Sequence, residues 1–446
     1  MTRSDAYRVS TFRVTGSAQP ARPRPAPGRA SAPNTRIYLR EYHADQAGAW
    51  ITGRCEPDEP EGGACGQPGA RLWGMGEQAI EYGDGTRVVH AGIPAPVDGQ
   101  PLRPGPVFAA PYHLSGDPAS TPYGYGRDAN PTWTWYERAL EELEGGPAVV
   151  FASGMAAISA VLFTVLRPGD AVVMPSDCYY SARALAQEEL AAYGVEVRFA
   201  PTAGDAQGAL LDGARLLWLE TPSNPGLEVC DIRRLADAAH AVGALVAVDN
   251  TTATPLGQRP LQLGADFSVA SDTKALTGHS DLLLGHVAAR DPQWAARVRR
   301  WRKLTGGVPG PMETWLAHRS LATLDVRLER QCASARAIAE WLLGRPEVRH
   351  VRYPGLPTDP SYEVAAKQMR RFGFLIGFEL PDAARAEAFL AACRLVGTAT
   401  SFGGVHTTAE RRARWGGDAV PEGFVRLSVG CENTEDLIAD LAQALG

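Results

Sequence analysis

Residues 244–274 read ALVAVDNTTATPLGQRPLQLGADFSVASDTK and contain two short, mainly apolar runs, each followed directly by polar residues. The apolar residues are consecutive rather than alternating, which is typical of strands buried on both faces of a parallel sheet. Asp249 follows the first run and Lys274 lies just beyond the second. The runs themselves are 244–248 and 266–270.

Further runs of the same kind lie between residues 136 and 320, separated by amphipathic segments such as 231–242. They are 148–151, 171–174, 216–219 and 282–288. We therefore predict an α/β domain with a mainly parallel sheet covered by helices on both sides. Beyond residue 320, helical patterns alternate with strand-like segments, which predicts a smaller α+β C-terminal domain. The helical patterns are 324–343, 383–394 and 434–445, and the strand-like segments are 373–380 and 425–429.

Residues 1–85 have a different composition, with five prolines between positions 20 and 33 and eight arginines against one acid in the first forty residues. This pattern predicts a poorly ordered extension without a core of its own. A transit peptide or a nucleic-acid-binding arm is a less favoured interpretation, because the prolines disfavour an amphipathic helix. Met75 is an alternative start, and we expect residues 1–74 to be dispensable for catalysis.

Composition excludes several classes of protein. With a formal net charge of −6, the 446-residue chain has no overall attraction for nucleic acid or an anionic membrane surface. It contains no run of eighteen apolar residues, so we expect no membrane-spanning segment. Seven scattered cysteines favour a reducing, cytoplasmic location over a disulfide framework. No cysteine or histidine spacing matches a zinc site, so no metal is predicted.

Polar residues at the ends of the predicted strands indicate where chemistry occurs, because ligands of open α/β sheets bind outside the carboxyl ends of the strands. Of the three lysines, Lys274, Lys303 and Lys367, only Lys274 follows a core strand. Small residues around Gly154 open a helix, and free amides there suit a phosphate. A phosphate cradle, the acid Asp249 and a lysine able to form a Schiff base together predict a site for pyridoxal phosphate (PLP).

Over about residues 86–446, the chain resembles the Cys/Met metabolism family of PLP enzymes. The segments that carry the resemblance are Tyr123-Gly124-Tyr125-Gly126-Arg127, Ser153-Gly154-Met155, Asp177-Cys178-Tyr179, Pro222-Ser223-Asn224-Pro225, Asp249-Asn250-Thr251, Ser271-Asp272-Thr273-Lys274, Ser401-Phe402-Gly403-Gly404 and Arg426-Leu427-Ser428-Val429-Gly430. The resemblance implies an aminotransferase-like fold (fold type I). It also implies an N-terminal arm at 86–135, a PLP-binding domain at 136–320 and a C-terminal domain at 321–446.

The resemblance further implies a role for each matched residue. Lys274 would bind PLP covalently and catalyse proton transfer, Asp249 would pair with the ring nitrogen, and Tyr179 would stack on the ring and take part in catalysis. Cofactor phosphate would be held by Gly154, Met155, Ser271 and Thr273, with Tyr125 and Arg127 of a neighbouring subunit. The substrate carboxylate would be bound by Arg426, Asn224 and Ser401. Such sharing implies a homotetramer built of active dimers.

The resemblance also implies a small sulfur-containing amino acid as substrate. We expect γ-elimination on L-cystathionine, which releases cysteine, 2-oxobutanoate and ammonia in transsulfuration. A cystathionine gamma-synthase or another sulfur-transfer enzyme acting on an O-acylhomoserine is the alternative, and a catalytically silent α/β binding protein is a more remote one. Two departures from the family leave specificity open: Thr400 stands where γ-lyases often carry glutamate, and Tyr180-Ser181 follow the ring-stacking tyrosine.

Overall fold

The computed structural model describes residues 82–446. The expected N-terminal extension, with its alternative start at Met75, lies almost entirely outside these residues. Helix α1 (Asp84–His90) begins two residues before the arm expected to start at residue 86. Within the described part, no helix combines the length and the apolar character needed to cross a membrane.

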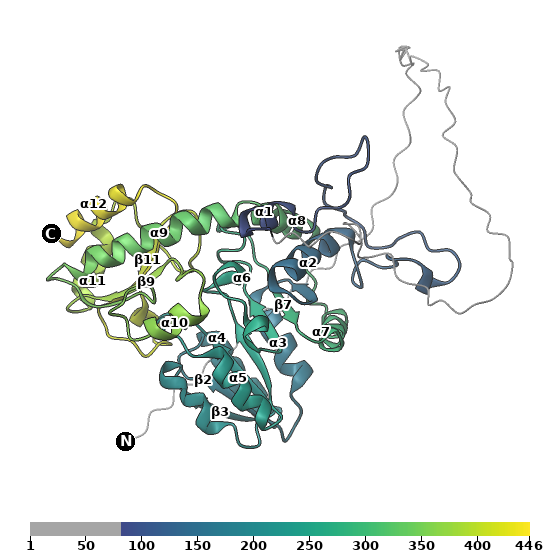
Figure 1. Ribbon diagram of the computed structural model, residues 1–446, viewed down its shortest axis with the longest axis horizontal. Coiled ribbons are helices and arrows are strands. Elements are labelled where there is room, and N and C mark those ends of the chain that lie inside the picture. Colours follow the sequence, from purple (N-terminus) through teal and green to yellow (C-terminus); the bar gives the residue numbers. More distant parts are fainter. Residues whose placement is uncertain (1–81) are drawn as a thin grey trace, which may run out of the picture. The chain divides into compact units, whose positions relative to one another are not determined.

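A seven-stranded sheet forms the centre of the first domain, in the order β1-β7-β6-β5-β4-β2-β3 (Figure 1). Strands β2 to β6 pair in parallel, whereas β7 is antiparallel to both of its neighbours. The strands are β1 (Ala148–Phe151), β2 (Ala171–Pro175), β3 (Glu196–Ala200), β4 (Leu216–Glu220), β5 (Leu245–Asp249), β6 (Phe267–Ala270) and β7 (Gly285–Ala289). The predicted α/β class with a mainly parallel sheet is confirmed.

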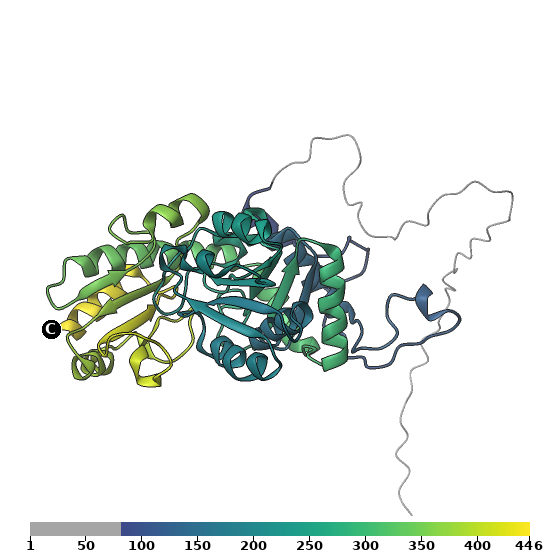
Figure 2. The ribbon, with the colours of Figure 1, turned by 90° about the horizontal axis from the view of Figure 1, so that it is seen from below.

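Helices cover both faces of this sheet, as the two views show (Figure 2). Along β1, Ala148 and Val150 pack with α2 (Pro131–Glu144), whereas Val149 and Phe151 pack with α3 (Gly154–Val165) and α7 (Pro292–Thr305). Helix α5 (Ile232–Ala241) covers β4 and β5. Successive side chains of each strand are therefore buried on opposite faces, which explains why the runs are continuously apolar.

The edge strand β3 was not predicted from the sequence. It pairs only with β2 at the end of the sheet, and its first residue, Glu196, is exposed. Because an edge strand need not be apolar throughout, its sequence, EVRFA, contains no continuous apolar run.

A five-stranded sheet, in the order β10-β11-β12-β9-β8, forms the C-terminal domain. Its strands are β8 (Arg349–Arg352), β9 (Leu375–Glu379), β10 (Gly397–Thr398), β11 (Thr408–Arg411) and β12 (Phe424–Ser428). Only β9 and β12 were predicted, and these are the most deeply buried. Helices α11 (Ala383–Ala392) and α12 (Thr434–Leu445) pack with them around one apolar core, which confirms the α+β C-terminal domain.

The long helix α9 (Leu324–Leu343) belongs to both cores (Figure 1). Leu324 and Leu328 belong to an apolar core of the first domain, whereas Ile338 and Leu342 pack with the C-terminal sheet. The helix therefore holds the second sheet against the first. The other α-helices are α4 (Tyr180–Ala184), α6 (Thr254–Gly257), α8 (Pro311–Leu321) and α10 (Tyr362–Gln368). Short 3-10 turns occupy Pro118–Ser120, Ala203–Leu210, Pro260–Leu263 and Arg412–Trp415, and a π-helical turn occupies Leu185–Leu190.

Candidate active site

A cavity of about 330 Å³ lies at the carboxyl ends of β4, β5 and β6, where the C-terminal domain closes it. Of the residues predicted from the sequence, those that line this cavity are Gly154, Met155, Tyr179, Asn224, Asp249, Ser271, Thr273, Lys274, Ser401 and Arg426. Tyr125 and Arg127 do not line it. Among residues 82–446, no group of three or more histidine, cysteine or acidic side chains could hold a metal ion.

Lys274 lies four residues beyond β6, and its Nζ donates a hydrogen bond to Ser401 Oγ at 2.7 Å. Burial, together with the positive charge of Arg426, lowers the pKa of Lys274 to about 8. An amine with such a pKa exchanges its proton readily near neutral pH, as an acid-base catalyst requires.

Asp249 ends β5, is buried and lines the cavity. Its carboxylate accepts a hydrogen bond from the Thr251 backbone N–H at 3.0 Å. Burial raises the pKa of Asp249, and hydrogen bonds from Thr251 with the charges of His286 and Lys274 oppose this shift. A protonated ring nitrogen beside this carboxylate would offset its lost hydration, so the site fits the pyridinium end of PLP.

The part of the cavity lined by Gly154, Met155 and Ser271 fits a phosphate. Helix α3 begins at Gly154, and its first backbone amides have no partner within the helix. A Cβ atom at Gly154 would lie 2.6 Å from Ser271 Cβ, so only glycine permits this close approach. Thr273 also lines the cavity, but its hydroxyl is already hydrogen-bonded to the backbone of Leu284 at 3.1 Å. The Gly154 and Met155 amides with Ser271 therefore form the more open part of the cradle.

Glu220 is a cavity residue that the sequence analysis did not assign. It ends β4 and accepts hydrogen bonds from the backbone N–H groups of Tyr179 at 2.7 Å and Asn224 at 3.1 Å. Burial raises the pKa of Glu220 well above its usual range. The signal was present, because an acid directly after a buried run had already singled out Asp249. Through these two backbone hydrogen bonds, Glu220 positions Tyr179 and Asn224.

Arg426 reaches the cavity from β12 of the C-terminal domain. It donates hydrogen bonds to Asn224 Oδ1 and to the Ser401 carbonyl oxygen, the latter at 2.8 Å, and forms an ion pair with Glu410. Burial lowers the pKa of Arg426 to about 10, although the charge of Glu410 opposes the shift. This guanidinium is suited to bind a carboxylate.

The family model described as "Cys/Met metabolism PLP-dependent enzyme" matches residues 106–446. The chain belongs to this family. PLP is therefore the cofactor of this enzyme, and the acid, the lysine and the phosphate cradle described above fit it.

Individual relatives show how close this PLP-dependent enzyme is to known members. It is 65% identical over 368 residues to a Streptomyces coelicolor protein named "Putative cystathionine gamma-lyase", covering 81% of this chain and 93% of that one. It is 39% identical to the cystathionine gamma-synthase of Mycobacterium tuberculosis, covering 83% and 98%. The solved structure of the cystathionine gamma-lyase CalE6 from Micromonospora echinospora superimposes with a TM-score of 0.76 at 38% identity, covering 82% and 99%. Other similar proteins are named L-methionine gamma-lyase and cystathionine beta-lyase.

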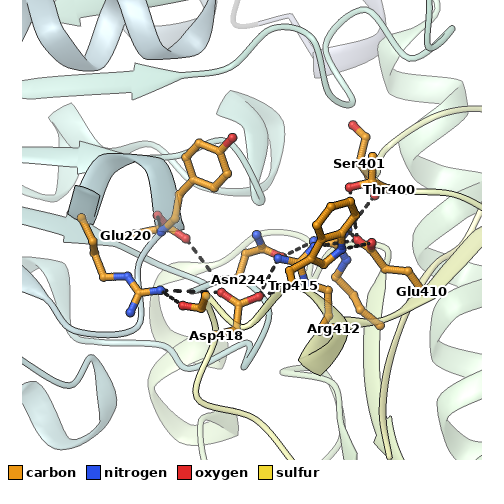
Figure 3. A network of polar contacts seen from close by, with 12 residues as sticks. Glu220, Asn224, Thr400, Ser401, Glu410, Arg412, Trp415 and Asp418 are labelled. Carbon is orange, nitrogen blue, oxygen red and sulfur yellow. Dashed lines mark hydrogen bonds and ion pairs between the residues drawn. The ribbon is translucent and has the colours of Figure 1, made fainter. Parts of the chain in front are cut away.

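The C-terminal wall of this enzyme's cavity contains a further residue that the sequence analysis did not assign, Arg412. It donates hydrogen bonds to Glu410 Oε1 at 2.7 Å and to Asp418, and Asp418 also pairs with Arg183 (Figure 3). Glu410, Arg412 and Asp418 belong to the segment 406–420. None of the motifs used in the sequence analysis includes them.

Tyr125 and Arg127 lie on the surface of the part of the chain that the structure describes. The Tyr125 side chain is 47% exposed, and the Arg127 guanidinium lies over its ring at 5.4 Å from the centroid. Neither residue lines the cavity described above.

Proposed function

We propose that this enzyme catalyses γ-elimination on L-cystathionine, which together with one water molecule gives cysteine, 2-oxobutanoate and ammonia. One observation supports this most directly: Lys274 Nζ and Arg426 contact the same residue, Ser401, through its hydroxyl and its carbonyl oxygen respectively. An amino acid whose carboxylate is bound by Arg426 therefore has its α-carbon near the lysine amine. That arrangement suits removal of the α-proton.

We propose a role for each cofactor-binding residue, and its position in the cavity supports that role. When bound, PLP supplies the electron sink that makes α-proton removal and loss of a γ-substituent feasible. Lys274 would hold the cofactor covalently and would transfer protons between Cα and the neighbouring carbons of the substrate. Asp249 would stabilise the protonated ring nitrogen. Tyr179, whose backbone N–H donates to Glu220, would cover the ring and assist proton transfer. The phosphate is bound by the Gly154 and Met155 amides, Ser271 and Thr273.

The substrate carboxylate is bound by Arg426, with Asn224 and Ser401 orienting the guanidinium. Replacing Arg426 with lysine keeps the charge but removes the planar pair of donors. We expect KM for L-cystathionine to rise roughly 10- to 100-fold, because a charge-assisted hydrogen bond contributes about 1.5–3 kcal/mol. Steady-state kinetics of the holoenzyme checks this, and an unchanged KM would place the carboxylate elsewhere.

We also propose that Tyr125 and Arg127 complete the phosphate site of a neighbouring subunit, within a homotetramer. Arg127→Ala and Lys274→Ala subunits, each inactive alone, should then regain part of the activity after mixing, because some hybrid sites contain both wild-type residues. Activity is measured together with subunit exchange, monitored by mass spectrometry. Complete exchange without recovery would show that the two residues act in the same protomer.

Incubation with L-cystathionine alone tests the reaction. Rapid formation of 2-oxobutanoate supports the lyase, because no external nucleophile is then present. The second candidate is a cystathionine gamma-synthase or another sulfur-transfer enzyme, and the uncharged Thr400 in the cavity favours it. Negligible 2-oxobutanoate from cystathionine, beside rapid cystathionine formation from an O-acylhomoserine and cysteine, would reverse the assignment.

A further inference from the structure

A second guanidinium faces the cavity that contains Lys274 and Arg426. Arg412 belongs to the 3-10 turn Arg412–Trp415, which follows β11 directly, and its side chain is 11% exposed. A nearly buried guanidinium is costly to desolvate, so its position in a ligand cavity calls for an explanation.

The partners of Arg412 leave part of it free for a ligand. Its Nε and Nη2 donate to Asp418, and its Nη1 donates to Glu410. A guanidinium has five N–H groups, so one on each terminal nitrogen is not used by these carboxylates. Two such donors are what a carboxylate needs for bidentate binding.

The charges around Arg412 also favour an anionic ligand group. Glu410 is shared with Arg426 and accepts a hydrogen bond from Trp415 Nε1 at 2.9 Å, and Asp418 is shared with Arg183 (Figure 3). The two carboxylates that contact Arg412 are therefore shared among three guanidinium groups. Thr400, whose hydroxyl lies 3.5 Å from Glu410 Oε1, adds no negative charge.

The turn that carries Arg412 is held rigidly against the first domain. Arg183 of α4 donates a hydrogen bond to the carbonyl oxygen of Gly417. A Cβ atom at Gly417 would lie 2.6 Å from Cδ2 of the Tyr180 ring, so the loop packs closely on α4. Tyr180, one of the two departures from the family pattern, thus contacts this loop. A preorganised guanidinium loses little entropy when it binds a ligand.

We propose that Arg412 binds a carboxylate at the leaving-group end of the substrate. The enzyme would thereby select γ-substituted amino acids whose substituent itself ends in a carboxylate, such as a cysteinyl thioether or a dicarboxylic ester, over those with a neutral substituent. This inference rests on the proposed roles of Arg426 and Lys274, but it holds for a lyase and for a synthase alike.

The test compares the holoenzyme with Arg412→Gln, using two matched substrate pairs. L-cystathionine and O-succinyl-L-homoserine carry the distal carboxylate, whereas L-methionine and O-acetyl-L-homoserine do not. We expect Arg412→Gln to lower kcat/KM roughly 10- to 100-fold for the charged member of each pair, through KM, and less than threefold for the neutral member. Dissociation constants of the same four compounds, measured by calorimetry, provide a readout that needs no turnover.

Arg414→Gln is the matched control, because Arg414 lies in the same turn and is exposed, with its guanidinium over the Trp415 ring. Arg414→Gln should leave kcat/KM unchanged for all four compounds. Arg412→Lys should preserve the fold and recover only part of the preference, since lysine keeps the charge but not the two parallel donors.

The proposal would be overturned if Arg412→Gln lowered kcat/KM equally for the charged and the neutral members. It would also be overturned if Arg414→Gln lowered kcat/KM for the charged members as much as Arg412→Gln does. If wild type converts only the esters, the proposed lyase reaction fails while the ester pair still tests Arg412. If wild type converts none of the four compounds, the dissociation constants test the proposal instead. Arg412→Gln should then weaken binding of the charged members more than binding of the neutral members.

Discussion

Lys274→Ala is expected to reduce turnover by more than about 10⁴-fold, because one residue supplies both the covalent attachment and the general acid-base catalyst. The chain has two other lysines, and neither can replace it. Lys303 Nζ pairs with Asp128 at 2.8 Å on a side chain that is 51% exposed, and Lys367 lies on α10. Borohydride reduction of the holoenzyme followed by peptide mapping should locate the cofactor on Lys274.

Lys303→Ala is the matched control for this experiment. It removes an identical side chain outside the cavity, so the cofactor absorbance and the activity should stay at wild-type levels. A reduced cofactor found on Lys303 or Lys367 would contradict the assignment of the site.

His286→Gln is expected to lower the free energy of unfolding by about 3–5 kcal/mol, the usual cost of removing one member of a buried ion pair. His286 in β7 is fully buried between two carboxylates, with Nδ1 on Asp272 and Nε2 on Glu144 at 3.1 Å. Tyr136 donates a further hydrogen bond to Asp272 at 2.9 Å. Urea unfolding of the holoenzyme measures the loss. A change below 1 kcal/mol would show that the two carboxylates do not depend on the imidazolium.

The same network predicts how this stabilisation depends on pH. Burial lowers the pKa of His286, but the charges and hydrogen bonds of Asp272 and Glu144 outweigh it and raise the pKa from 6.5 to about 10. Because the folded state binds the proton more tightly, the contribution is fully present below pH 6.5 and declines as pH rises toward 10. The difference in stability between wild type and His286→Gln should therefore shrink from pH 6 to pH 9.5.

His240→Gln is a suitable control, since His240 pairs with Asp266 at 2.9 Å on a side chain that is 36% exposed. Exposed pairs contribute about 0–1 kcal/mol. If both variants lost a similar free energy of unfolding, burial of the His286 network would add nothing to stability.

The sequence by itself was sufficient for the central sheet and for most of the cofactor site. Strands buried on both faces produce continuous apolar runs, and this local signal needs no knowledge of the partners of each strand. Asp249 and Lys274 were found because the carboxyl ends of parallel strands meet at one edge of a sheet. The edge strand β3 and the short strands β8, β10 and β11 were not predicted, because short or half-exposed strands contain no continuous apolar run.

Only the tertiary structure showed which distant residues meet. Arg426 and Glu410 pair across adjacent strands of the C-terminal sheet, and Arg412 reaches the same cavity as Lys274. Nothing in the segment 406–420 indicates these contacts, because they depend on how α9 holds the second sheet against the first. Buried charges are determined by the carboxylates and guanidinium groups that packing brings together, and packing between distant segments leaves no periodic pattern in the sequence.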